Sequence, residues 1–177
     1  MYPFLRLIAS TAAARRMSPL DPLDTHISQH RVRLADCDIF GEMNNGRILT
    51  LYEFGRFQLS QRVGLWKLLR TKGWGFTVAG SSIRYRARLT PLERYEMRTR
   101  LVHWDGRFVH LEQGMFKHDG RCANHLLIRT AVVSKGKAVP TAEVMEALDF
   151  DQASPQAPKW VKAWMEAEQQ RPWPPEM

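Results

Sequence analysis

A long helical pattern followed by a run of strand-like stretches is the feature of this sequence that most restricts its fold. Apolar residues recur at three- and four-residue spacing for about five turns, which predicts a helix over about 46–70. Gly64 predicts a break or kink within this helix, and Gly73 predicts its end. The strand-like stretches that follow lie at roughly 75–89, 92–104, 107–118 and 121–134.

Turn signals divide these stretches into an antiparallel meander. Thr90-Pro91, Asp105-Gly106 and Asp119-Gly120 stand between them, and Asp-Gly pairs are strong hairpin signals. One further strand-like segment begins earlier, near Ser28. A long apolar helix followed by a meander packs well when the sheet curls around the helix. The pattern therefore predicts an α+β domain in which an antiparallel sheet wraps one long central helix.

The two ends of the chain differ from this domain, which is expected over residues 28–148. Residues 149–177 indicate a Pro-rich linker and a last helix, and residues 1–27 a basic amphipathic segment. In that first segment the apolar residues that fall on one helical face are Phe4, Leu7, Ile8 and Ala12. The segment fits a helix that docks on the domain, an interfacial membrane helix or a transit-like leader, and docking is favoured.

The composition narrows the class of partner. Lys and Arg number 26 against 18 Asp and Glu, and a net charge of +8 favours polyanions in general. The basic–aromatic interleaving of RNA-binding proteins is missing, so no nucleic acid is expected. No stretch approaches the ~18 consecutive apolar residues that cross a bilayer. The two isolated cysteines, Cys37 and Cys122, favour a reducing compartment, here the cytoplasm.

The segment from Asp36 to Arg47 holds the residues on which a functional assignment depends. Its first half imitates a calcium loop, with Asp at positions one and three and Gly at position six. Position five is Phe40, however, and position twelve is Arg47 in place of a bidentate Glu, so calcium is not expected. No other metal-ligand spacing occurs, and neither a metal nor a redox cofactor is expected.

Together with the helix that follows, this segment resembles the thioesterase branch of the hotdog superfamily. The pattern there is Asp-x-Asp-x-x-Gly-His-x-Asn-Asn before a helix that opens Gly-Arg-Tyr-Leu. The matching residues are Asp36, Asp38, Gly41, Asn44, Asn45, Gly46, Arg47 and Leu49. The resemblance covers about residues 28 to 148 and looks most like the small bacterial, 4-hydroxybenzoyl-CoA thioesterase-like enzymes with a Met-Asn-Asn-Gly-Arg motif. It implies a hotdog fold and a homodimer or dimer of dimers, with active sites between subunits.

The resemblance makes Asp38 the expected catalytic carboxylate. An ionised aspartate can attack a thioester carbonyl directly or activate a water. The alternative is a turn or cap residue, which is the role expected for Asp36. The backbone N–H groups from Asn45 to Arg47 are expected to be open to an oxyanion at the positive end of the helix dipole. Asn45 and Gly46 are therefore substrate-binding candidates together with Arg47. Either Asn44 or Asn45 can cap the helix, and capping is the favoured role of Asn45.

Further charged residues have two interpretations each. Glu53 matches the helix acid that in related enzymes acts as base or nucleophile across the dimer, or it forms an ion pair with Arg56 or Arg47. Alternation places Arg84, Arg86 and Arg88 on one sheet face, where guanidinium groups suit the phosphates of coenzyme A or remain solvated.

The expected activity is hydrolysis of acyl-CoA thioesters to a free acid and CoA. Two positions depart from the family pattern, because Glu42 replaces its His and Ile48 its Tyr. If that His assists catalysis or binds substrate, its role is changed or absent here. The alternative function is therefore a non-catalytic acyl-thioester-binding protein. Peripheral membrane contact through residues 1–20 is a possible addition to either function.

Overall fold

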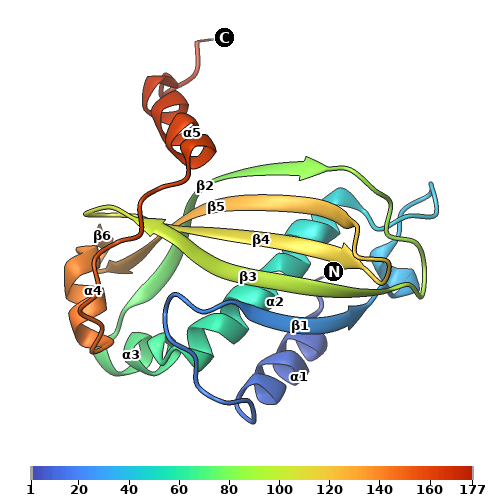
Figure 1. Cartoon of the computed structure of the whole chain (residues 1–177), viewed down its shortest axis with the longest axis horizontal. Coiled ribbons are helices and arrows are strands. Elements are labelled where there is room, and N and C mark those ends of the chain that lie inside the picture. Colours follow the sequence, from blue (N-terminus) through green and yellow to red (C-terminus); the bar gives the residue numbers. More distant parts are fainter. Residues whose placement is uncertain (1, 177) are drawn as a thin grey trace.

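The computed structural model describes residues 2–176 of the chain, from an N-terminal helix to a C-terminal one (Figure 1). The helices are α1 (Phe4–Ala14), α2 (Asn45–Arg62), α3 (Leu65–Lys72), α4 (Thr141–Ala147) and α5 (Lys159–Gln170), with a short 3-10 turn at Leu34–Asp36. The strands are β1 (His26–Arg31), β2 (Gly75–Tyr85), β3 (Arg94–Trp104), β4 (Val109–Lys117), β5 (Cys122–Ser134) and β6 (Lys137–Ala138).

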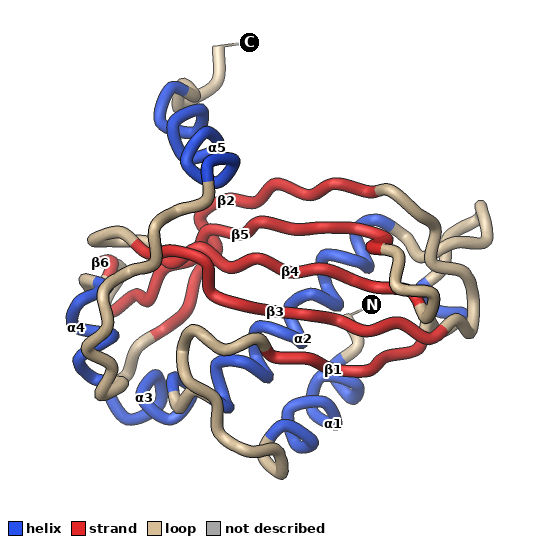
Figure 2. The backbone as a smooth tube through the Cα atoms, viewed as in Figure 1, coloured by secondary structure: helices blue, strands red, loops and turns tan. Residues whose placement is uncertain are grey.

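All strands over the described residues belong to one antiparallel sheet. Its order is β1-β3-β4-β5-β2, and the two-residue β6 adds to β5. The sheet curls over α2, which crosses beneath the strands (Figure 2). The turns at Asp105-Gly106 and Asp119-Gly120 join consecutive strands, as predicted. The α+β hotdog architecture expected from the sequence is confirmed.

A close approach at Gly55 holds α2 against the sheet. A Cβ atom on this residue would lie 2.5 Å from Thr99 Oγ1 and 2.7 Å from Met97 Sδ, so only glycine fits. Leu51 and Phe54 are fully buried beside it. Since Met97 and Thr99 face the helix, the alternate residues of β3 point to the outer face of the sheet.

The helical pattern over 46–70 forms two helices instead of one. α2 ends at Arg62, Gly64 takes a left-handed φ of 82°, and α3 begins at Leu65. Glycine adopts this conformation without the strain that a Cβ causes, so the chain turns there. The break predicted at Gly64 is confirmed, while the continuous helix is wrong. Gly73, with a φ of 64°, ends α3 as predicted.

The N-terminal helix α1 docks on α2, but only partly through the face that its pattern favoured. Phe4 and Ile8 are 65% and 62% exposed. The inward contacts are both apolar and polar. Leu7 packs against the core and Ala14 is buried, while Arg6 pairs with Asp36 and Gln58 Nε2 donates to Ser10 O at 3.0 Å. Docking itself is confirmed. Of the predicted apolar face, Leu7 packs inward, whereas Phe4, Ile8 and Ala12 face outward.

The C-terminal helix α5 covers part of the outer face of the sheet. Val161 is fully buried against Val102 and Leu127, and the Trp164 ring lies 6.2 Å from the ring of His110. Among the described residues, no helix combines the length and apolarity needed to cross a membrane. The predicted domain limits, residues 28 and 148, stay an interpretation. The helix α5 lies beyond the second limit and packs on the sheet.

Candidate active site at the start of helix α2

A cleft of about 500 Å³ opens where the loop after β1 meets the start of α2. It is lined by Tyr2, Ala35, Asp36, Cys37, Asp38, Asn44, Gly46, Arg47 and Thr50. The predicted site residues Asp38, Gly46 and Arg47 are therefore brought together. Sequence reasoning missed Tyr2 and Thr50: the first comes from the distant N-terminus, and the second lies on the helical turn after the motif.

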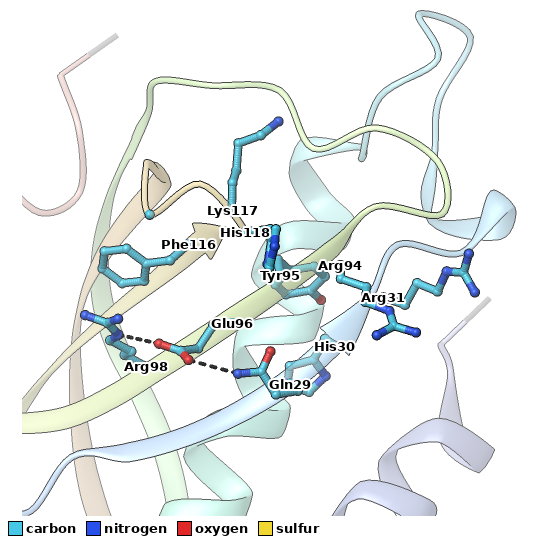
Figure 3. A pocket seen from close by; sticks show the side chains of 11 residues that line it. Gln29, His30, Arg31, Arg94, Tyr95, Glu96, Arg98, Phe116, Lys117 and His118 are labelled. Carbon is cyan, nitrogen blue, oxygen red and sulfur yellow. Dashed lines mark hydrogen bonds and ion pairs between the residues drawn. The ribbon is translucent and has the colours of Figure 1, made fainter.

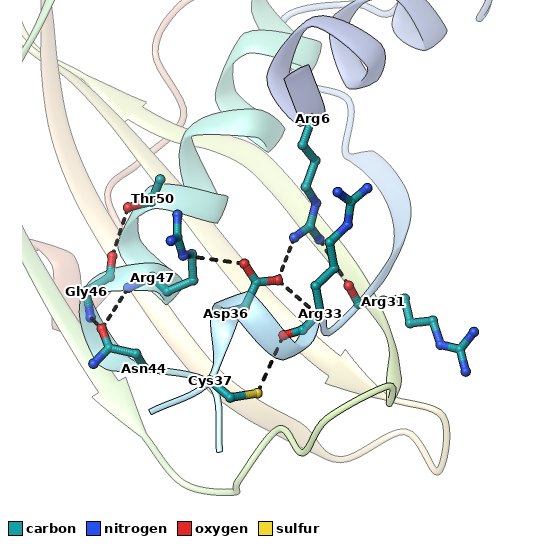
Figure 4. Close-up of polar contacts among 9 residues, drawn as sticks. All are labelled: Arg6, Arg31, Arg33, Asp36, Cys37, Asn44, Gly46, Arg47 and Thr50. Carbon is teal, nitrogen blue, oxygen red and sulfur yellow. Dashed lines mark hydrogen bonds and ion pairs between the residues drawn. The ribbon is translucent and has the colours of Figure 1, made fainter. Parts of the chain in front are cut away.

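Asp36 forms the structural anchor beside this cleft, as Figure 4 shows. Its carboxylate is only 4% exposed and lies 2.6 Å from Arg6 Nη1 and 3.4 Å from Arg47 Nε. It also accepts the backbone N–H of Arg33 at 3.1 Å. A buried carboxylate needs such partners to offset its lost hydration. The role expected for Asp36, a turn residue, is confirmed, with the addition of a long-range ion pair to α1.

Asp38 lies two residues later in a tight turn and has a different environment. Its N–H donates to Glu42 O at 2.9 Å, and its C=O accepts from Gly41 N–H at 3.1 Å. Its side chain is half-buried, and Oδ1 accepts the Phe40 N–H at 2.9 Å. Over residues 2–176 Oδ2 forms no hydrogen bond, so the turn fixes the carboxylate through one oxygen and leaves the other available in the cleft.

Asn44 is the N-cap of α2, and this corrects the expected oxyanion site. Its Oδ1 accepts from Gly46 N–H at 2.9 Å and from Arg47 N–H at 3.2 Å. These two donors are therefore engaged, which is what a capping Asn does at N2 and N3. Asn45 is not the cap; its side chain is exposed, and its backbone N–H forms no hydrogen bond within the described part of the chain.

Cys37 also lines the cleft, but its environment does not favour a nucleophilic thiolate. Burial raises the pKa of this thiol, and the nearby carboxylates of Asp36 and Asp38 raise it further. The protonated thiol is a weak nucleophile. Its Sγ instead contacts Arg33 O at 3.6 Å.

Glu53 lies outside the lining of this cleft. Its Oε2 accepts the Tyr2 hydroxyl at 2.7 Å, and burial together with Glu53 raises the pKa of Tyr2 so that it stays a donor. Among the described residues Glu53 lies within ion-pair distance of neither Arg56 nor Arg47, so the predicted close pair does not form, although its charge acts to raise the pKa of Arg56. The N-terminal segment supplies its partner instead, and no local spacing could reveal that contact.

The predicted row of arginines extends past the end of β2. The strand ends at Tyr85, and the N–H groups of Arg86 and Ala87 donate to the same Ala123 O at 2.8 and 2.9 Å. The alternate residues Ile83, Ala87 and Leu89 pack against the core, whereas the side chains of Arg84, Arg86 and Arg88 are all exposed. The side-chain alternation that predicted the row is therefore present, although only Arg84 lies within a strand.

Arg88 has a partner of its own, at the position where the family pattern has His. Its Nε lies 3.0 Å from Glu42 Oε2, and the neighbouring Met43 N–H donates to Leu89 O at 2.8 Å. Glu42 therefore ties the Asp38 loop to the segment after β2.

A larger cleft of about 760 Å³ lies on the outer face of the sheet, over β1, β3 and β4 (Figure 3). Glu96 in its wall accepts from Arg98 Nε at 2.7 Å and from Gln29 Nε2 at 2.9 Å. This cleft contains neither Asp38 nor the start of α2, so it is not the candidate active site. No group of three or more His, Cys, Asp and Glu among the described residues is arranged to hold a metal ion.

Comparisons with known proteins identify relatives of this chain. Protein THEM6 of Danio rerio is 37% identical over 118 residues, which make up 66% of this chain and 58% of that protein. The chain therefore spans less than two thirds of the length of this relative. The predicted bacterial branch is untested by this match and stays a prediction.

Solved structures and a family profile complete the comparison. A probable thioesterase, YbaW from Escherichia coli, has a TM-score of 0.65 at 21% identity, over 70% of this chain and 96% of that one. A DHNA-CoA thioesterase from Staphylococcus aureus has a TM-score of 0.63 at 14% identity, over 82% and 91%. These likenesses show the fold. The profile of the thioesterase-like superfamily matches residues 32–165, and the chain belongs to that superfamily.

Proposed function

We propose that the protein hydrolyses acyl-CoA thioesters to a free acid and CoA, with Asp38 as nucleophile or general base. The observation that carries this proposal is the division between two neighbouring aspartates. Three residues engage Asp36, whereas Asp38 keeps one oxygen available in a cleft at the positive end of α2. Membership in the thioesterase-like superfamily supports thioester hydrolysis in general.

Thioester hydrolysis requires this carboxylate and an oxyanion donor, and few other groups. The leaving thiol has a pKa of about 8.5, so it departs without a strong general acid. In the general-base route, Asp38 takes a proton from water as the water oxygen bonds to the carbonyl carbon. The C–S bond then breaks, CoA leaves as a thiolate, and the proton returns to it. In the nucleophilic route, Asp38 itself attacks and gives an anhydride that water hydrolyses. The Asn45 N–H is the proposed oxyanion donor.

The remaining predicted residues are assigned to CoA binding and to a partner subunit. Arg84 and Arg86 are exposed and are proposed to contact the CoA phosphates, as is Arg47 at the cleft. Among the described residues β2 pairs only with β5, which leaves it an eleven-residue edge strand. This edge supports a homodimer or dimer of dimers built along it. Glu53 is proposed to act as a base or nucleophile across that dimer.

The test is thiol release from short, long and aromatic acyl-CoAs by the native protein, Asp38→Asn and Glu53→Gln. Turnover by the native protein that falls about 10²- to 10⁴-fold in Asp38→Asn supports the assignment, since general bases contribute that much. Analytical ultracentrifugation must show the same oligomeric state for Asp38→Asn as for the native protein. Native protein that binds acyl-CoA but turns over none of the panel contradicts the proposal and favours the binding protein, with Glu42→His as the next variant.

One observation also supports peripheral membrane contact through residues 1–20, as an addition to cytoplasmic catalysis. The outward residues of α1 are all apolar: Phe4, Leu5, Ile8, Ala9, Ala12 and Ala13. Exposed Arg15 and Arg16 follow them, and no acidic residue occurs in this segment. An apolar face flanked by cations is typical of helices that lie in the interface of an anionic bilayer.

Vesicle flotation tests this contact with phosphatidylcholine vesicles that contain or lack phosphatidylserine. We expect the native protein to float with the anionic vesicles, and the triple variant Phe4→Ser, Leu5→Ser, Ile8→Ser to remain below. A double variant at other exposed apolar residues, Leu92→Ser with Trp173→Ser, should float like the native protein. Absence of native flotation, or equal flotation of the triple variant, rejects the contact.

A further inference from the structure

A buried guanidinium between α2 and the sheet has fewer partners than its burial demands. Arg56 is 8% exposed, and its Nη1–H donates to Gln113 Oε1 at 2.8 Å. This is the only hydrogen bond of the guanidinium among the described residues. No carboxylate there lies within ion-pair distance of it, although the more distant charge of Glu53 acts to raise its pKa. Burial lowers its pKa to about 10, which still leaves it charged at neutral pH. A buried charge is costly unless it is paired.

The position of this guanidinium is fixed by its one partner. Gln113 Nε2 donates to Tyr52 O at 2.9 Å and to Thr99 Oγ1 at 2.8 Å, so the amide oxygen must face Arg56. All of these groups are buried. The network holds the guanidinium in one orientation and engages only one of its several N–H donors.

Two small cavities meet at this side chain. One, of about 60 Å³, lies between α2 and the inner face of the sheet and is otherwise mainly apolar. The other, of about 100 Å³, reaches from Arg56 to Glu53 and Val78. Arg56, Ser60 and Phe76 line both. The remaining donors of Arg56 are therefore available at a cavity wall in a mainly apolar space, where an acceptor would gain most from them.

The second cavity lies along α2 from the candidate active site. Tyr2 lines the cleft of the candidate active site and donates to Glu53, which lines this cavity, so one hydrogen bond links the walls of the two spaces. With a rise of about 1.5 Å per residue, Arg56 is about 9 Å along the helix from Thr50 and about 15 Å from Gly46. An extended chain advances about 1.2 Å per bond, so about seven to twelve bonds cover this distance.

We propose that Arg56 binds a carboxylate at the far end of the acyl group, so that the enzyme prefers medium-chain acyl-CoAs that carry a terminal carboxylate. The proposal rests on thioester hydrolysis at Asp38 and names the substrate class. A carboxylate supplies what the more distant Glu53 does not, namely a counter-charge in direct contact and the paired acceptors that a guanidinium fork accommodates. The mainly apolar walls of the two cavities suit the methylenes nearest the terminal carboxylate.

The test compares CoA thioesters of equal length, suberyl-CoA against octanoyl-CoA and sebacyl-CoA against decanoyl-CoA. We expect the native protein to show kcat/KM at least about tenfold higher for the carboxylate-bearing member of each pair, since one well-paired charge is worth that much. Arg56→Met should abolish or reverse this ratio, and Arg56→Lys should keep part of it. Arg121→Met, at an exposed arginine on the β4–β5 turn, is the matched control and should leave the ratio unchanged.

Equal kcat/KM values within both native pairs overturn the subsite, as does a preference that survives in Arg56→Met. Failure of catalysis is distinguishable from failure of the subsite. If the native protein hydrolyses no thioester, calorimetric binding of the same pairs still decides. Tighter binding of suberyl-CoA than octanoyl-CoA that is lost in Arg56→Met, or in Arg56→Lys if the first variant does not fold, upholds the subsite. Equal binding of the pair rejects it.

Discussion

Asp36 and Asp38 differ by two positions in the sequence and by almost everything in their environment. Asp36 is buried, and its oxygens face two guanidinium groups and a backbone N–H. Asp38 is half-buried in a turn and accepts one N–H through a single oxygen. The residue type is the same, so the partners decide the role. A carboxylate whose oxygens are occupied holds the fold together, whereas one with an available oxygen beside a helix N-terminus can do chemistry.

The largest effects should come from exchanging the two side chains for asparagine. Asp36→Asn removes the counter-charge of a buried pair, and we expect unfolding to require about 3–5 kcal/mol less. Asp38→Asn should change stability by less than about 1 kcal/mol while it abolishes most of the turnover. Denaturant titration with the slope held constant measures the first effect, and thiol release the second.

The contrast between the two aspartates is contradicted if Asp36→Asn keeps its stability or if Asp38→Asn keeps its turnover. Normal stability of Asp36→Asn would show that Arg6 and Arg47 contribute little through this carboxylate. Full turnover by Asp38→Asn would remove the reason for treating the two residues differently.

The next effect is expected at the partner on α1. Arg6→Met removes the shortest contact of Asp36, at 2.6 Å, but leaves Arg47 and the Arg33 N–H in place. We therefore expect a loss of about 1.5–3 kcal/mol, smaller than for Asp36→Asn. Amide exchange should accelerate in α1 and stay unchanged in β4. Uniform acceleration across the sheet would contradict a local anchoring role.

The sequence predicted the fold better than it predicted the site, for a physical reason. The helix, the meander and the Asp-Gly turns depend on periodicity and turn chemistry within short stretches, and these survive in the structure. The polar contacts of α1 depend on Asp36 and Gln58, distant residues that no local pattern links to it. Arg56 was considered only as a surface partner for Glu53, because helical spacing shows which residues are neighbours and not how deeply each is buried.

The candidate site was predictable where the motif constrains the backbone. Asp38, Gly46 and Arg47 line one cleft because the loop and the first helical turn are contiguous in sequence. The engaged N–H groups were not foreseen, because either Asn44 or Asn45 fitted the cap and only the backbone conformation distinguishes them. The turn geometry that separates Asp36 from Asp38 likewise depends on contacts with α1, α2 and the segment after β2.

A pH dependence should follow from the burial of His30, near Arg6. Burial, together with the charges of Arg6 and His26, lowers the pKa of His30 to about 4, below about 6.5 in the unfolded chain. Between these values the unfolded state binds the proton more readily, so stability should fall as the pH drops from about 6.5 toward 4. The loss is at most about 1.4 kcal/mol per pH unit for this histidine. In His30→Gln, the difference in unfolding free energy between pH 7 and pH 5 should shrink, and an unchanged difference would assign the pH dependence to other groups.

The smallest effect is expected at the ion pair that ties the Asp38 loop to the segment after β2. The Arg88 side chain is 75% exposed, so water screens its contact with Glu42. Arg88→Gln should cost only about 0.2–1 kcal/mol of stability, far less than any change at Asp36. This variant also tests the role of the turn that holds Asp38. The N–H of Asp38 donates to Glu42 O, its C=O accepts from Gly41 N–H, and the ion pair of Glu42 with Arg88 holds this turn from outside. If that positioning matters, Arg88→Gln lowers kcat more than it lowers stability, and Glu42→Gln lowers it similarly. Equal kcat in both variants would show that the backbone contacts alone hold the Asp38 turn.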